Sequence, residues 1–147
     1  FQYSPVDFVM TGGDYDFTLA ELCDALSEIS NYPAGLWYRN NRDILCTGSP
    51  VMQHDLNTLP FIDRHLTRWQ LYACKNGNFK YTPGTYIMAG RDCWWGKCSF
   101  CSWASLYPAA SYRTVTVDRH IEEIGRLITD FPVREIFDDS GSFPAGD

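Results

Sequence analysis

Three cysteines stand within nine residues of one another in the segment 93–101, which reads CWWGKCSFC. Four residues separate Cys93 from Cys98, two separate Cys98 from Cys101, and Gly96 lies in the longer gap. Because glycine permits tight turns, this segment can fold as a loop whose thiolates converge on one metal centre. The spacing therefore predicts that Cys93, Cys98 and Cys101 are metal ligands.

The number of nearby ligands restricts the kind of centre. A plant-type [2Fe-2S] ferredoxin shares the start of this spacing but needs a fourth thiolate, and a closed structural zinc site also needs four ligands. The next candidate, His120, is nineteen residues beyond Cys101. Cys74 could complete the set only if a long loop folded back onto the site. Three protein ligands would leave one coordination position open for chemistry.

Composition and charge exclude several classes of protein. The chain has 147 residues, of which 45% are hydrophobic and 20% charged, so it is long enough and apolar enough to form a packed core. Its net charge of −6 disfavours nucleic acid as a partner, since phosphate binding needs a basic face. We expect no membrane insertion, because no run of eighteen apolar residues is present.

The remaining cysteines indicate the cellular compartment, and the two chain ends indicate whether the sequence is a whole protein or a fragment. Cys23, Cys46 and Cys74 are scattered rather than paired in a regular framework, which is typical of an intracellular metal protein, so we expect a reducing, cytoplasmic location. The chain begins without methionine and stops soon after a predicted strand. We therefore expect it to be a fragment of a longer protein.

The elements around the cysteines predict a parallel β/α unit. An apolar strand at 86–89 leads into the cysteine loop, a helix capped by Thr116 follows, and a strand at 133–137 ends in Asp138 and Asp139. A strand, helix, strand unit of this length is typical of a right-handed parallel crossover. The cysteine loop and the acidic turn would then lie at the same carboxyl edge of the sheet.

The first part of the chain predicts a strand at 6–10, a turn at Gly12, Gly13 and Asp14, a helix with a Thr18–Glu21 capping box, and a hairpin over 36–46. This order is typical of the end of an open α/β sheet. Proline and glycine interrupt the stretch 47–85, which we interpret as a linker. Its two histidines, at 54 and 65, lack neighbours at ligand spacing and are interpreted as surface or packing residues.

Taken together, these segments resemble the radical S-adenosylmethionine superfamily, and within it the cobalamin-binding branch. The resemblance rests on AGRDCWWGKCSFCSW at 89–103, Arg113, EIFDDSGSF at 135–143, VDFVMTGGDYDFTLAELCDAL at 6–26 and LNTLPFIDRHL at 56–66. It implies an α/β protein in which 1–46 is the tail of an open cobalamin-binding sheet, 47–85 is the linker, and 86–147 holds the first β/α units of a partial TIM-like barrel. The family's usual spacing has three residues between its first two cysteines, where this chain has four.

The resemblance also implies cofactors and their ligands. Cys93, Cys98 and Cys101 would hold a [4Fe-4S] cluster whose fourth iron binds S-adenosylmethionine. The aromatic residue before the third cysteine, here Phe100, would pack near the adenine, and the turn of Asp138 and Asp139 would face the methionine ammonium group.

The implied activity is reductive cleavage of S-adenosylmethionine to start radical chemistry on an unidentified substrate, with methyl transfer through cobalamin as a further expectation. An electron donor such as flavodoxin or ferredoxin would be a partner. Gly12, Gly13 and Asp14 would flank the cobalamin nucleotide, and this fragment by itself is expected to be inactive. The alternative from another class is a non-catalytic iron-sulfur or zinc module used for electron transfer or structure.

Overall fold

The computed structural model describes residues 4–28, 30–102 and 112–143, and the chain divides into two compact units. The first comprises residues 1–54 and 97–109, and the second 55–96 and 110–147. Over the described ranges the fold is mixed α/β, with three helices of the α type and sheets of three, two and two strands, none of which closes into a barrel. The helices described here include none with the length and apolar character needed to cross a membrane.

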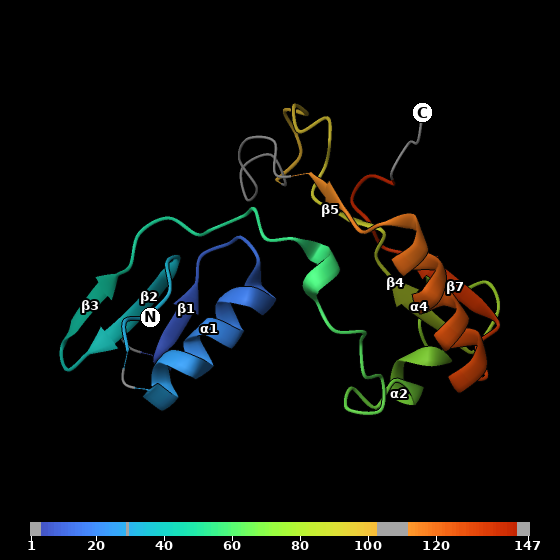
Figure 1. Ribbon diagram of the computed structural model, residues 1–147, viewed down its shortest axis with the longest axis horizontal. Helices are drawn as coiled ribbons and strands as arrows, with labels where there is room; N and C mark the ends of the chain where they lie inside the picture. The colour runs from blue at the N-terminus through green and yellow to red at the C-terminus, as the bar shows by residue number, and fades with distance from the viewer. Residues whose placement is uncertain (1–3, 29, 103–111, 144–147) are drawn as a thin grey trace. The chain divides into compact units, whose positions relative to one another are not determined.

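The first unit combines one helix with an antiparallel meander. Its elements are β1 (Phe8–Met10), α1 (Tyr15–Glu28), β2 (Leu36–Asn40) and β3 (Asp43–Cys46). The predicted hairpin is confirmed as β2 and β3, and β1 pairs with the other edge of β2 (Figure 1). Because β1 and β2 are antiparallel, Met10 at the end of β1 lies opposite Leu36 at the start of β2. The carboxyl ends of these two strands therefore lie at opposite edges of the sheet, unlike those of parallel strands in an open α/β sheet.

A glycine turn fixes the start of α1. Gly13 has φ +80°, and a Cβ at this position would lie 2.7 Å from the carbonyl oxygen of Val51 and 2.9 Å from Cβ of Pro50. Glycine is therefore required both by the backbone angle and by the space. The carbonyl of Asp14 accepts the N–H of Thr18 at 3.0 Å, so the helix begins one turn before the predicted cap.

The second unit contains the parallel pair. Its elements are η1 (Leu56–Thr58), α2 (Gln70–Ala73), β4 (Gly84–Ile87), β5 (Gly90–Arg91), β6 (Arg113–Thr114), α4 (Val117–Asp130) and β7 (Glu135–Asp138). Strands β4 and β7 are parallel, with Ile87 opposite Asp138, which confirms the predicted β/α unit (Figure 1). Strands β5 and β6 form a short antiparallel pair immediately before and after the stretch that carries the cysteines.

Local signals account for α4. The Thr116 side chain accepts the N–H of Arg119 at 3.4 Å, as the predicted N-cap requires, and Asp118 lies in the first turn, where a carboxylate is favourable. The helix ends where the N–H of Phe131 donates to the carbonyl of Leu127. Among the described residues of this unit, the buried apolar ones are Leu56, Trp69, Ala73, Phe79, Ile87, Ala89 and Leu127. Several of them come from the stretch 47–85, whose role as a linker between domains stays a prediction.

Candidate metal centre

The three clustered cysteines are free thiols in a loop. Cys93, Cys98 and Cys101 are all half-buried, whereas Cys23, Cys46 and Cys74 are exposed. Gly96 has φ +55°, and the N–H of Cys101 donates to the carbonyl of Cys98 at 3.2 Å, so the loop turns tightly at two points. Partly exposed thiols without disulfide partners fit a centre of iron or zinc, which thiolates bind well. Trp103, at the end of the segment 89–103, lies outside the described residues.

The unit division passes through this loop, since Cys93 belongs to the second unit and Cys98 and Cys101 to the first. Over the part of the chain that the structure describes, no three His, Cys, Asp or Glu side chains form a group that could hold a metal ion. The fit to a cluster therefore rests on the chemistry and spacing of the thiols. Convergence of the three thiolates stays a prediction.

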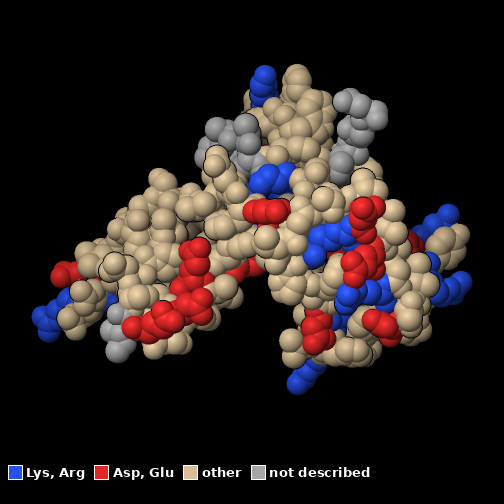
Figure 2. All heavy atoms as spheres, viewed as in Figure 1, with Lys and Arg blue, Asp and Glu red and all other residues tan. Residues whose placement is uncertain are grey.

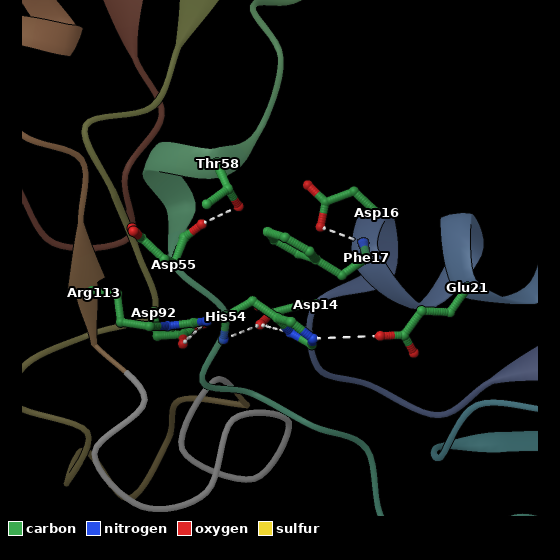
Figure 3. Close-up of polar contacts among 9 residues, drawn as sticks. All are labelled: Asp14, Asp16, Phe17, Glu21, His54, Asp55, Thr58, Asp92 and Arg113. Carbon is green, nitrogen blue, oxygen red and sulfur yellow. Dashed lines mark hydrogen bonds and ion pairs between the residues drawn. The ribbon is translucent and has the colours of Figure 1, made fainter.

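Asp92, which precedes the first cysteine, is a site residue that the spacing of the cysteines did not reveal. It adopts φ +69°, is 4% exposed, and its Oδ2 lies 3.4 Å from Nη2 of Arg113 (Figure 3). A left-handed conformation costs a non-glycine residue about 1 kcal/mol, although aspartate tolerates it better than most. A buried carboxylate paired with an arginine can hold that conformation, and it thereby fixes the direction in which the chain enters Cys93. The sequence feature that could have identified Asp92 is its place directly before Cys93.

The acidic turn after β7 is bonded to the same segment. Asp138 Oδ2 accepts the N–H of Ala89 at 3.0 Å, and its Oδ1 accepts the N–H of Ser140 at 2.9 Å. The Ser140 hydroxyl oxygen in turn accepts the N–H of Gly90 at 2.9 Å. The Asp138 and Ser140 side chains therefore hold the backbone that runs from β4 towards the cysteines. The Asp139 carboxylate is on an exposed residue and makes no side-chain hydrogen bond within the described ranges.

Tyr112 and His120 also lie near Asp138 in this unit. The Tyr112 hydroxyl donates to the carbonyl of Ser142 at 3.3 Å, and burial, followed by the charges of Cys93 and Asp138, raises the pKa of this tyrosine above its ordinary value. Nε2 of His120 lies 3.7 Å from Asp138 Oδ2. Nδ1 of His120 is buried and has no hydrogen-bond partner among the described residues. In the sequence His120 is nineteen residues beyond Cys101, too far for a zinc site of the usual kind, and its spacing gives no sign of the contact with Asp138.

The other predicted cofactor residues lie in the first unit. Phe100 is 90% exposed, so its ring is accessible to a ligand. The space beside Gly13 is filled by Pro50 and Val51. Asp14 is 0% exposed and its Oδ2 accepts from both the backbone N–H and ring Nδ1 of His54. The role of Gly12, Gly13 and Asp14 in holding cobalamin stays a prediction.

A substitution at Asp138 tests the link between the acidic turn and the cysteine segment. In Asp138→Ala the amide of Ala89 loses a charged acceptor, and hydrogen bonds to charged groups contribute about 1.5–3 kcal/mol. We expect hydrogen exchange at the Ala89 amide to accelerate at least about ten-fold, measured by NMR on the metal-free chain. The control is Asp139→Ala, which removes an exposed carboxylate and leaves that amide protected. Equal exchange at Ala89 in Asp138→Ala and in the parent chain would contradict the assignment.

Comparisons with known proteins do not identify the chain: a scan against models of protein families, a search of curated proteins and a search of solved structures each returned no match.

Proposed function

We propose that this chain is part of a radical S-adenosylmethionine enzyme. The observation that carries the proposal is the combination of three free, half-buried cysteines with an acidic turn that is hydrogen-bonded to the segment leading into them. The parallel β4–α4–β7 unit would be the first unit of a partial TIM-like barrel, in which sites form at the carboxyl ends of strands.

The proposal gives each residue a task. Cys93, Cys98 and Cys101 would hold a [4Fe-4S] cluster, which when bound supplies the electron that cleaves S-adenosylmethionine. Of the two candidate carboxylates, that of Asp139 is the better partner for the methionine ammonium group, because both oxygens of Asp138 already accept backbone N–H groups. The exposed Phe100 ring would cover the adenine.

Two tryptophans in the cysteine loop would shield the cluster from water. Trp94 and Trp95 stand between the first two cysteines, 60% and 51% exposed, with their ring centroids 5.8 Å apart. Apolar side chains beside a cluster restrict water and influence its potential, so we assign them that task. Methyl transfer through cobalamin, with Gly12, Gly13 and Asp14 beside its nucleotide, stays a prediction.

Electron paramagnetic resonance tests the proposal directly. Anaerobic reconstitution of the full chain with iron and sulfide, followed by reduction, is expected to give a [4Fe-4S] signal that changes shape when S-adenosylmethionine is added. In Asp139→Ala we expect the same cluster signal with a weaker response to S-adenosylmethionine, because one charged contact is lost. A protein that takes up only zinc and stays spectroscopically silent would refute the proposal and favour a structural metal module.

A further inference from the structure

A second cluster of polar side chains lies in the first unit and is independent of the cysteines. It contains Asp14, Glu21 and His54, with the Phe17 ring stacked on the imidazole at a centroid distance of 4.3 Å and an interplanar angle of 8° (Figure 3). Asp14 directly precedes α1, and Phe17 and Glu21 follow it at three- and four-residue steps, so the three side chains lie on one side of the first turns of the helix. His54 comes from the segment that packs against Gly13.

The hydrogen bonds of His54 fix the orientation of its ring. Asp14 Oδ2 lies 2.8 Å from Nδ1 and also accepts the backbone N–H of His54 at 3.2 Å. Because the Asp14 carboxylate is fully buried and is an acceptor, it favours the tautomer that carries its proton on Nδ1. The lone pair of Nε2 then faces Glu21, whose Oε1 is 3.7 Å away.

This arrangement is the one used by histidines that bind metal ions. Such histidines donate their other ring N–H to a carboxylate, which fixes the ring and raises its basicity. Two ligands at about 2.1 Å from a tetrahedral ion lie about 3.4 Å apart, close to the observed separation of the Glu21 and His54 atoms. The His54 side chain is 22% exposed and that of Glu21 is 54% exposed, so an ion can reach both.

The charge of α1 favours a cation at the same place. The helix carries Asp16, Glu21, Asp24 and Glu28 and no lysine or arginine. Figure 2 shows acidic side chains gathered over this helix. A surface of one sign raises the local concentration of oppositely charged ions.

We propose that Nε2 of His54 and the carboxylate of Glu21 bind a divalent transition-metal ion of the Zn²⁺ type, with Asp14 as the outer carboxylate that orients the histidine. Two protein ligands leave the other coordination positions to water or to an exogenous ligand, so the site is open rather than closed. The proposal does not depend on the radical enzyme function, because none of its residues belongs to the cysteine loop.

The test removes the cysteine centre first. In the full chain with Cys93, Cys98 and Cys101 changed to serine, Zn²⁺ is titrated and followed by calorimetry and by the ring ¹⁵N signals of the histidines. We expect a saturable shift at Nε2 of His54. His54→Gln and Glu21→Gln should each weaken the affinity by at least about ten-fold, because even outer ligands contribute ten- to hundred-fold.

Two controls test whether Zn²⁺ binds at this cluster rather than elsewhere on the chain. His65→Gln replaces an exposed histidine outside the cluster and should bind Zn²⁺ like the parent chain. Circular dichroism checks that each variant is folded. If His54→Gln does not fold, the Zn²⁺ affinity of Glu21→Gln, which changes a residue on the exposed side of the cluster, carries the test. The proposal is overturned if Zn²⁺ binds equally with and without Glu21, or if both nitrogens of His54 are protonated and unresponsive to Zn²⁺. The latter would show an imidazolium paired with two carboxylates.

Discussion

Cys98→Ala is expected to abolish iron and sulfide loading of the chain. Cys98 is the middle ligand of the predicted set, and its loss would leave only two thiolates in a loop that is otherwise held by short turns. Since removal of an outer-shell partner already weakens metal affinity ten- to hundred-fold, loss of a direct ligand should lower loading by more than about ten-fold. The measurement is iron and acid-labile sulfide per chain after anaerobic reconstitution and gel filtration.

Cys23→Ala is the matched control for this substitution. Cys23 lies on α1, is exposed, and belongs to the same chain with the same thiol chemistry. Loading of this variant should equal that of the parent chain. If Cys98→Ala still bound iron at the parental level, or if Cys23→Ala lost it, the assignment of the three clustered cysteines would be wrong.

Short-range signals in the sequence predicted the second unit well. Thr116 was expected as an N-cap and is one, and the parallel pairing of the strands on either side of α4 was expected from the order of elements. The strand before the cysteines was placed at 86–89 but is observed at Gly84–Ile87. The strand begins earlier because Gly84 and Thr85 already pair with Glu135 and Ile136, and it ends before Ala89, whose N–H bonds to the Asp138 side chain.

In α1 the sequence signals and the packing of the folded chain favour different residues, both for the start of the helix and for its buried face. The Thr18–Glu21 capping box predicted the start, but the turn at Gly13 begins the helix at Tyr15. The three- and four-residue steps between Leu19, Leu22, Leu26 and Ile29 predict one apolar stripe. In the structure Leu19 and Leu26 are 49% and 53% exposed, whereas the buried positions are Thr18, Leu22 and Ala25. Ile29, the last member of that stripe, lies outside the described residues. Periodicity identified the helix, but tertiary packing selected the face that is buried.

Site residues that act through contacts between distant segments could not be found by spacing. His54 was interpreted as a surface or packing residue because no ligand lies near it in sequence, and its partner Asp14 is 40 residues away. Asp92 meets Arg113, which is 21 residues further along the chain, and His120 on α4 meets Asp138 at the end of β7. Such pairs form only when the fold brings distant segments together, whereas the three cysteines could be predicted as metal ligands from their spacing alone.

Arg64 connects three segments of the second unit, and its guanidinium is almost fully enclosed. The residue is 5% exposed, its Nε donates to the Thr85 hydroxyl at 3.1 Å, and its Nη2 donates to the Tyr86 carbonyl at 2.7 Å. Nη2 also lies 3.4 Å from Oε1 of Glu123 on α4, whose side chain is 14% exposed. Arg64 therefore ties β4 and α4 to the segment before α2.

Arg64→Met is expected to lower the free energy of unfolding by about 3 kcal/mol, because it leaves the largely enclosed Glu123 charge and the partly buried Tyr86 carbonyl without their cationic partner. The measurement is urea denaturation followed by circular dichroism. The matched control is Arg126→Met on α4, whose ion pair with Glu122 is more than half exposed on both sides and whose loss should cost less than about 1 kcal/mol. Similar losses in the two variants would show that burial of Arg64 does not make its contacts stronger than those of a surface pair.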